Sequence, residues 1–392
     1  MTGNALQIPF GDPAFLAGNP DPELAELRRG CPVSWQTDAE LWAVTGLREI
    51  QTVGKDPATF CSGRGVLLSD RGRDIAAEDS LLYLDPPRHE QYRKLVNRAF
   101  TPRRVAILEP RVRELTVELL DSIDPSRPVD LVDALCAPLP MLVIAELLGL
   151  PAEDRDSFHR WSDAIMEAAT DLTEENALQA LELMGYFDIQ LDARADRPTE
   201  DLLTGLLAAE VDGTRLTRAE VQGFCMTLMV AGNETTRSLV SGGMVELARH
   251  PEQRARLAAD PTLIPAAVEE MLRWVTPIMA MGRTTTGDAT LGDAELGAGE
   301  FVLLAYGAAN RDEEVFGDTA DVFDISRTPN PHVSFGFGEH FCIGASLARI
   351  EARVLLEEVL ARWPDYALAG DVVRAPSTLF RQITRAPVLF AP

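Results

Sequence analysis

The sequence predicts a mainly α-helical protein with a smaller β-rich part, folded as a single domain over residues 1–392. Three observations carry this prediction. Apolar residues recur with helical spacing through most of residues 108–207, a second helical stretch extends from Thr217 to His250, and patterns typical of β-strands are confined to a few short segments. No linker, low-complexity run or internal repeat divides the chain, and its 46% hydrophobic residues can bury a core large enough to enclose a cofactor.

Charge and cysteine content exclude several classes of protein. A net charge of −25 opposes sequence-independent binding to nucleic acid or to an anionic membrane. The five cysteines are scattered and never spaced as C-x-x-C, so neither a disulfide framework nor a structural zinc site is expected. The longest apolar run, residues 134–145, is too short to span a bilayer, and the first residues do not resemble a signal peptide. We therefore expect a cytoplasmic protein.

One segment departs from the acidic character of the chain. Between Arg88 and Arg113 there are eight basic residues and only two acidic ones, Glu90 and Glu109. Such a basic segment suits an acidic protein partner, because opposite charges speed association and fix orientation.

The first hundred residues contain short elements. Residues 41–45 have the β-branched and aromatic content of a strand, and residues 61–80 predict a loop. Asp85-Pro-Pro then opens a helix, since proline is tolerated where a helix begins. On this helix His89 and Arg93 stand four residues apart and share one face, which by itself indicates no more than a solvated surface.

The long helical stretch contains a segment that helix propensity does not explain. Thr217 and Glu220 form a capping-box pattern at its start, and Pro251 stops it. In the middle lies Ala231-Gly-Asn-Glu-Thr-Thr236, where Gly232 costs about 1 kcal/mol relative to alanine. The hydroxyls of Thr235 and Thr236 could simply bond back to carbonyls one turn earlier. Alternatively, a small residue leaves room for a ligand and the acid–alcohol pair Glu234–Thr235 relays protons.

Further elements follow in the C-terminal half. Residues 266–274 predict a helix on which Glu270 and Arg273 form an i, i+3 pair, usually a surface ion pair. The apolar, irregular segment 277–283 suits the lining of a lipophilic pocket. Residues 289–296 predict a β-hairpin, residues 301–306 a buried strand, and residues 343–362 a helix. Strand-like pieces close the chain around residues 379–383.

Before the last helix, a glycine-broken loop carries Cys342. Phe335, Gly338, Cys342 and Gly344 follow the order F-x-x-G-x-x-x-C-x-G, in which the glycines let the backbone bend and approach a flat group. The helix dipole favours the thiolate, which is what a soft metal ligand must be. From this loop alone three interpretations stay open: a haem-iron ligand, an ordinary buried cysteine, or a nucleophile activated by His340.

The loop, extended through Leu347-Ala348-Arg349, resembles the haem-binding loop of the cytochrome P-450 family. Four other segments resemble that family in order and spacing: the His89/Arg93 helix, residues 231–235, the Glu270/Arg273 helix and residues 308–312. Glu313 stands where the family often has proline. The resemblance implies the cytochrome P-450 fold around a buried haem b (iron protoporphyrin IX), and monooxygenation that inserts one atom of O₂ into a C–H bond.

The resemblance also implies roles for individual residues. Cys342 would ligate the iron, and Glu234 and Thr235 would activate oxygen. The haem would be bound by Ala231, Gly232, Phe335, Gly338 and Gly344, with its propionates paired to His89, Arg93, Arg283 and His340. A buried network would join Glu270, Arg273 and Arg327. Substrate contacts are expected from Met229, Val230, Ile278, Met279, Met281 and Phe380, and a mobile lid from residues 157–197.

The resemblance leaves the reaction's partners to be inferred. The chain lacks a G-x-G-x-x-G fingerprint and a cluster-binding cysteine set, so electrons must come from outside, and we expect a ferredoxin with its reductase. Arg98, Arg103 or Arg104 is the expected docking region. The substrate is expected to be lipophilic: a sterol, branched lipid, terpene or secondary-metabolite precursor. A haem-thiolate peroxygenase, isomerase or gas sensor, or a haem-free binding protein, remain alternatives.

Overall fold

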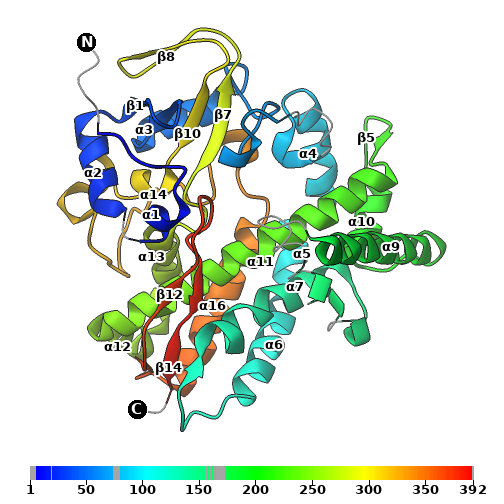
Figure 1. Ribbon diagram of the computed structural model, residues 1–392. Helices are drawn as coiled ribbons and strands as arrows, with labels where there is room; N and C mark the ends of the chain where they lie inside the picture. The colour runs from blue at the N-terminus through cyan, green and yellow to red at the C-terminus, as the bar shows by residue number, and fades with distance from the viewer. Residues whose placement is uncertain are drawn as a thin grey trace.

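The computed structural model describes residues 6–18, 20–73, 80–154, 157–158, 160–161, 164 and 173–390. Its helices contain far more residues than its short strands. The predicted fold class, mainly helical with a smaller β-rich part, is therefore confirmed. Figure 1 shows one long helix, α11 (Arg218–Arg249), running diagonally through the middle of the molecule. The β-rich part with β1, β7 and β10 lies on one side of α11, and α6, α7 and α16 lie on the other.

The capping box predicted at the start of α11 is present. The Thr217 hydroxyl accepts the Glu220 N–H at 3.2 Å, and the Glu220 carboxylate accepts the Thr217 N–H at 2.7 Å, so two of the free N–H groups at the helix start are satisfied. The helix is continuous through residues 231–236. The unfavourable propensity of that segment is overridden by packing, because α11 lies against α7 (Pro138–Leu148), α13 (Ile264–Val275) and α16 (Ala345–Arg362).

The helical part forms one hydrophobic core around α11. It includes α4 (Arg88–Ala99), α5 (Pro102–Ile107), α6 (Glu109–Asp121), the π-helical turn Val132–Cys136, α9 (Glu174–Asp196), α10 (Leu202–Ala208) and α12 (Pro251–Ala259). Of the predicted lid, the structure describes α9 and a few residues before it; the remainder lies outside the described residues. The small strands β5 (Glu210–Val211) and β6 (Thr214–Arg215) pair just before α11.

The β-rich part is built on a five-stranded sheet with the order β1-β2-β10-β7-β3. Its strands are β1 (Val33–Gln36), β2 (Leu41–Val44), β3 (Phe60–Cys61), β7 (Met281–Thr285) and β10 (Phe301–Leu304). The pair β10–β2 is parallel and the other pairs are antiparallel. The short helices α1 (Pro13–Ala17), α2 (Asp21–Gly30), α3 (Leu47–Lys55) and α14 (Tyr306–Ala309) complete this part.

Several sequence-predicted boundaries are confirmed and two are wrong by two residues. The hairpin at residues 289–296 is present as β8 (Ala289–Leu291) and β9 (Ala294–Leu296), with Gly292 in the left-handed region at φ +58°. The strand predicted for residues 301–306 ends at Leu304, because Tyr306 begins α14. The last helix begins at Ala345 rather than at residue 343, since the cysteine loop continues through Gly344.

Short strands near the C-terminus join distant parts of the chain. β14 (Pro387–Leu389) pairs with β4 (Val129–Asp130) and with β11 (Ala367–Leu368), and β12 (Val373–Arg374) pairs with β13 (Ile383–Arg385). Glu313, which departs from the family pattern at the start of α15 (Glu313–Phe316), accepts hydrogen bonds from Arg28 at 2.7 and 3.0 Å. The glutamate at this position therefore links α15 to α2 through hydrogen bonds.

One buried acid in α16 gives the fold a pH dependence. Glu351 is 2% exposed, and its Oε2 has no hydrogen-bond partner among the described residues. Burial raises the pKa of Glu351 from 4.5 to about 8. The folded protein therefore keeps a proton that the unfolded chain releases.

We expect the substitution Glu351→Gln to change how stability varies with pH. Because the raised pKa of Glu351 stabilises the folded state at low pH and this stabilisation is lost as the pH rises, wild type should lose up to about 1.4 kcal/mol per pH unit between about pH 5 and 8 relative to E351Q. Urea midpoints of both proteins at several pH values measure this difference. A difference that stays constant with pH would contradict the assignment.

Candidate active site

The loop before α16 holds Cys342 in a backbone shape that glycine makes possible. Gly336 and Gly338 lie in the left-handed region at φ +70° and +79°. The Cys342 N–H donates to the carbonyl oxygen of Phe335 at 2.9 Å, which closes the loop. A Cβ atom on Gly338 would overlap the backbone of Gly54 in α3, whereas one on Gly336 would have no atom nearer than 3.8 Å. Gly338 thus lets the loop pack directly on α3.

Gly344 serves a different purpose from the one expected. Its φ of −82° is open to any residue, so backbone freedom is not the reason for glycine there. A Cβ on Gly344 would lie 3.8 Å from the Cys342 sulfur, next to the face that a ligand of the thiol would occupy. The backbone N–H groups of Gly344 and Ala345 also point to this sulfur and lower its pKa.

The Cys342 thiol is accessible but surrounded by protein. Its side chain is exposed, yet burial raises the pKa of Cys342 and outweighs the N–H groups of Gly344 and Ala345 and the charges of Arg93 and Arg349. The position of the sulfur before α16 therefore does not by itself offset the effect of burial on its pKa. A cation bound at the sulfur would supply the missing stabilisation of the charged form.

A second accessible point lies in the middle of the long helix α11. Ala231 is exposed, whereas the other residues from 220 to 248 are buried or half-buried. Thr235, one turn later, is half-buried and donates its hydroxyl to the Ala231 carbonyl at 2.5 Å. Glu234 is 2% exposed and accepts from Arg237 at 3.2 Å. The acid and the alcohol are thus adjacent to a gap in the packing around α11.

Gly232 faces the helices rather than this gap. A Cβ on Gly232 would lie 2.8 Å from Cδ1 of Ile144 in α7. The close approach of α7 and α11 therefore accounts for glycine at this position, instead of the room for a ligand that the sequence suggested.

The predicted anion-binding residues His89 and His340 lie together. Their rings stack with centroids 4.2 Å apart, and Glu339 lies 3.8 Å from His89 Nδ1 and 3.4 Å from His340 Nε2. The Ser62 hydroxyl lies 3.1 Å from His340 Nε2. His89 is 1% exposed, and neither of its ring nitrogens has a hydrogen-bond partner among the described residues.

The charges around this pair favour an anion. Burial and the neighbouring His340 together lower the pKa of His89 to about 4, although Glu339 opposes the change. Positive charges also act from Arg93 on His89 and from Arg283 on His340. His89, Glu339 and His340 are close enough to hold a metal ion, but two nearby guanidiniums would repel one. A carboxylate ligand would instead satisfy the buried ring nitrogens, so these residues fit haem propionates.

The two predicted arginines occupy different elements. Arg93 in α4 donates to the Phe341 carbonyl at 2.6 Å, beside the cysteine. Arg283 in β7 is 6% exposed and donates to the Gly282 carbonyl at 2.6 Å. The ring of Phe335 is held in place by Arg349, which lies outside the loop. The Arg349 guanidinium lies 4.6 Å from the Phe335 ring centroid and forms an ion pair with Glu269 at 2.6 Å.

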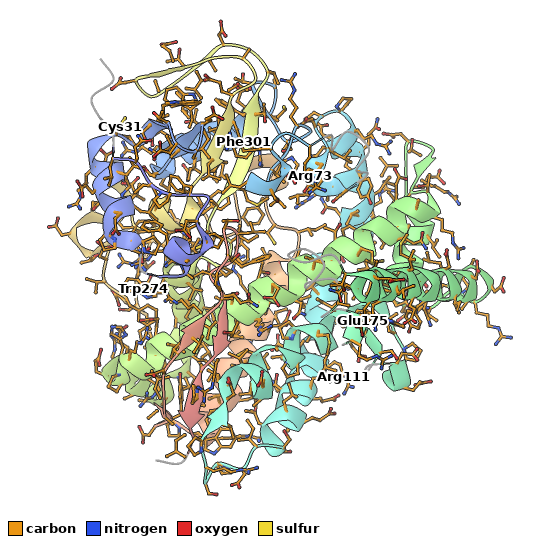
Figure 2. The ribbon with its side chains drawn as sticks, in the orientation of Figure 1. Cys31, Arg73, Arg111, Glu175, Trp274 and Phe301 are labelled. Carbon is orange, nitrogen blue, oxygen red and sulfur yellow. The ribbon has the colours of Figure 1, made fainter. Side chains whose placement is uncertain are left out.

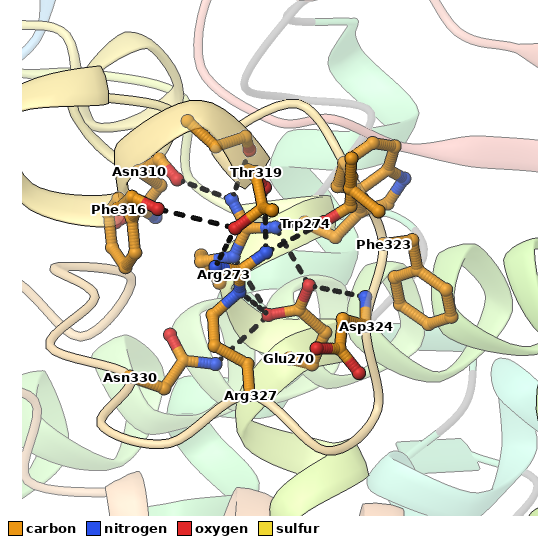
Figure 3. Close-up of polar contacts among 12 residues, drawn as sticks. Glu270, Arg273, Trp274, Asn310, Phe316, Thr319, Phe323, Asp324, Arg327 and Asn330 are labelled. Carbon is orange, nitrogen blue, oxygen red and sulfur yellow. Dashed lines mark hydrogen bonds and ion pairs between the residues drawn. The ribbon is translucent and has the colours of Figure 1, made fainter.

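The structure brings Glu270, Arg273 and Arg327 into one buried network (Figure 3). Glu270 and Arg273 are fully buried and joined by two hydrogen bonds of 2.7 and 2.8 Å, and Arg327 donates to Glu270 at 3.1 Å. The Asp324 N–H and the Asn330 amide complete the shell of Glu270 at 2.9 and 3.0 Å. Both carboxylate oxygens of Glu270 are thereby satisfied, as burial of a charge requires.

The expected substrate residues do not behave alike. Val230, Ile278, Met281 and Phe380 are half-buried. Ile278 and Phe380 face each other in an isolated β-bridge. Met229 is 1% exposed in the helical core, and Met279 is 7% exposed and packs toward the N-terminal segment around Phe10. Burial of these two methionines argues against direct contact with a substrate.

Sequence reasoning missed the supporting residues of the site. Asp85 accepts the N–H groups of Ser62 and Gly63 at 2.7 and 2.9 Å, which positions Ser62 beside His340. Asn310 donates to Ser334 at 2.8 Å and accepts the Val333 N–H at 2.8 Å, at the start of the cysteine loop. The sequence offered a signal for both residues, because Asp85 lies directly before two prolines and Asn310 lies within the family-like segment 308–312. Their hydrogen-bond partners carried no such signal.

Comparisons with known proteins show which family the chain belongs to. A family model described as cytochrome P450 matches residues 135–364. A methyl-branched lipid omega-hydroxylase of Mycobacterium tuberculosis is 37% identical and a vitamin D(3) 25-hydroxylase of Pseudonocardia autotrophica 39% identical, each aligned over 95% of this chain and over 91% and 94% of its own length.

Solved structures share the same fold. Cytochrome P450 CYP109Q5 from Chondromyces apiculatus superimposes with a TM-score of 0.89 at 40% identity, covering 98% of both chains. CYP109E1 from Bacillus megaterium, solved with testosterone, gives a TM-score of 0.88 at 35% identity over 95% of this chain and 100% of that one.

We expect Gly338→Ala to damage the site more than Gly336→Ala. Both substitutions force a side chain into the left-handed region, at a cost of about 1 kcal/mol or more, but only Gly338→Ala also pushes the loop away from Gly54. The urea midpoint and the fraction of cofactor retained after gel filtration measure the effect. Equal losses in the two variants would mean that the contact with α3 does not hold the loop.

Proposed function

Because this chain belongs to the cytochrome P450 family, we propose that it hydroxylates a sterol-like or branched-chain lipid with electrons from a ferredoxin. Its relatives are monooxygenases that use haem b, so the chain is a haem-dependent monooxygenase. The observation that carries the proposal for the site is the accessible thiol of Cys342, set among N–H groups and two guanidiniums before α16. We extend the proposal to one domain over residues 1–392 and to a cytoplasmic protein. No described helix has both the length and the apolarity that crossing a bilayer requires.

Cys342 would ligate the haem iron, and His89, Arg93, Arg283 and His340 would hold the propionates. The haem, when bound, supplies the oxygen activation that no amino-acid side chain provides. The unsatisfied ring nitrogens of His89 support this placement, because a carboxylate would satisfy a buried polar group that otherwise weakens the fold. Ala231 is the exposed point of α11 where a flat group could approach the helix.

Glu234 and Thr235 would hold and relay protons beside the accessible Ala231 of α11. The Thr235 hydroxyl now donates to the Ala231 carbonyl, so it can accept a further hydrogen bond at its lone pairs without leaving the helix. Glu234 is buried and forms an ion pair with Arg237, three residues later, at 3.2 Å, which fixes the position of its carboxylate. This pairing favours activation of O₂ over a peroxide-dependent reaction.

The network of Glu270, Arg273 and Arg327 would fix the backbone behind the haem. Arg273 binds the carbonyl oxygens of Asn310 and Ala320 at 2.8 and 2.7 Å, and Asn310 in turn holds Ser334 and Val333. A fully desolvated charge network contributes little net stability, so its value lies in one fixed arrangement of the loop.

The substrate class rests on the relatives and on the accessible apolar residues. Two relatives are named for a methyl-branched lipid and for vitamin D(3), and one similar structure contains testosterone. Val230, Ile278, Met281 and Phe380 carry no charge and are half-buried, which suits an extended or polycyclic lipophile. The bridge between Ile278 and Phe380 would set the width of the pocket between two separate segments.

We expect the ferric protein to change spin state when titrated with steroids, vitamin D(3) or methyl-branched fatty acids. Phe380→Ala should raise the dissociation constant of the best ligand about tenfold, because an aromatic contact contributes about 1–2 kcal/mol. Val373→Ala, an exposed apolar residue of the neighbouring strand β12, serves as the control and should leave the dissociation constant unchanged. Product that forms with peroxide but not with O₂ and a reductase would contradict the monooxygenase function.

The basic segment from Arg88 to Arg113 offers fewer free charges than its sequence suggests. Arg88 pairs with Glu220, Lys94 with Glu90, and Arg113 with Glu357 and Glu358. Arg111, labelled in Figure 2 at α6, pairs with Glu114, Glu118 and Glu146.

Two exposed arginines of this segment remain for an acidic partner. Arg98 and Arg103 are exposed, and Arg98 donates to the Glu210 carbonyl but has no carboxylate within 4 Å in the described part of the chain. The side chain of Arg104 lies outside the described residues. These two positions are therefore the proposed centre of ferredoxin docking.

We expect the double variant R98Q/R103Q to slow electron transfer from a ferredoxin about tenfold at low ionic strength and to flatten its dependence on salt. Arg127→Gln, which removes an exposed charge outside the segment, is the matched control. Stopped-flow reduction of the ferric protein measures both. An unchanged rate and salt dependence in R98Q/R103Q would mean that the docking surface lies elsewhere.

A further inference from the structure

A second hollow, whose lining includes six charged side chains, lies away from the cysteine loop. It has a volume of about 540 Å³ and is lined by the N-terminal segment, the last turns of α11, the end of α13 and the strands β12 and β13. Figure 2 shows Trp274, one of its lining residues, between the N-terminal helices and α11. None of the residues assigned above to haem, oxygen or substrate lines it.

Positive charge gathers in this hollow although the chain as a whole carries −25. Four arginines line it and only two acids, Asp21 and Glu246. The arginines are Arg249, Arg311, Arg374 and Arg381. Asp321 lies outside the lining but 3.6 Å from Arg311, so even with its charge included the arginines remain in excess.

The acids do not neutralise the arginines one by one. Asp21 is shared between Arg311 at 3.2 Å and Arg381 at 2.8 Å. Although burial alone would raise the pKa of Asp21, these two arginines hold it well below its usual range. Glu246 pairs with Arg249 at 2.8 Å. Arg374 has no carboxylate within 4 Å among the described residues and donates only to the Gly18 carbonyl, at 3.1 Å.

Two of the guanidinium groups are buried, and each has one N–H donor without a partner among the described residues. Arg311 and Arg381 are 6% and 8% exposed, and the Nε of each has no hydrogen-bond partner in the described part of the chain. Arg311 is also fixed in orientation, because its guanidinium stacks 3.8 Å from the ring centroid of Trp274. A preorganised fork with an unused N–H is suited to an oxyanion.

We propose that this hollow binds a small oxyanion, a phosphate or carboxylate compound, among Arg249, Arg311, Arg374 and Arg381. The bound anion would neutralise Arg374, which lacks a carboxylate, and would accept hydrogen bonds from buried guanidiniums. A volume of about 540 Å³ admits a small metabolite but not a folded partner.

An anion in this hollow would affect the position of the β12–β13 strand pair. The segment that connects these two strands contains Phe380, one of the proposed substrate residues. Arg381 follows Phe380 directly, and its N–H donates to the Pro277 carbonyl at 2.9 Å, next to Ile278. An anion held by Arg381, Arg374 and Arg249 would connect this strand pair with the end of α11. The anion site itself does not depend on the proposed substrate or electron donor.

Isothermal titration of the ferric holoprotein with inorganic phosphate, and separately with succinate, tests the proposal. We expect saturable one-to-one binding of at least one of the two at constant ionic strength, with phosphate or succinate preferred according to the chemistry of the natural ligand. Arg374→Gln and Arg249→Gln should each weaken this binding at least tenfold. Both positions are partly exposed, so folding should survive the substitutions.

Arg385→Gln is the matched control, because Arg385 lies on β13 beside β12, is 62% exposed and does not line the hollow. Its binding should equal that of wild type. Three results would overturn the proposal: no saturable binding of either anion, an equal loss in R385Q and R374Q, or a shift of the haem absorption that follows the titration and so locates the anion at the iron.

Discussion

The buried carboxylate of Glu270 is the constraint on which the arrangement of the site depends. Glu270 accepts hydrogen bonds from the side chains of Arg273, Arg327 and Asn330 and from the backbone N–H of Asp324. Of these partners, only Arg273 lies on the same helix as Glu270. Through Arg273 the network reaches Asn310, and through Asn310 it reaches Ser334 at the entrance of the cysteine loop. A charge that must be paired in the interior thus fixes how α13, the segment after α14 and the loop lie relative to one another.

Local chemistry then shapes the loop itself. Gly338 allows contact with the backbone of α3, and Arg349 holds the ring of Phe335 from the first turns of α16. The result is an accessible sulfur whose surroundings do not yet favour its charged form. The site is therefore prepared for a metal that stabilises the thiolate, while the histidine pair beside Glu339 is prepared for carboxylates. In the proposed function, one group, a haem, would meet both demands.

Much of this could be predicted from sequence because it is local. The capping box of α11, the β8–β9 hairpin and the order of glycines around Cys342 are all encoded within a few neighbouring residues. The parallel pairing of β2 with β10, the contact of Gly338 with Gly54 and the role of Asn310 join residues far apart in the chain, so no local pattern reports them. The prediction of substrate residues was incomplete for the same reason, since an apolar side chain such as Met229 can belong to the hydrophobic core as well as to a pocket.

The central claim is that Cys342 is the thiolate ligand of a haem iron, and the ferrous carbonyl complex tests it most directly. The purified protein should show the shifted Soret band of thiolate ligation, and Cys342→His should lose that band and its hydroxylation even where haem is retained. A thiolate-type band that persists in the Cys342→His variant, or undiminished hydroxylation by that variant, would contradict the account.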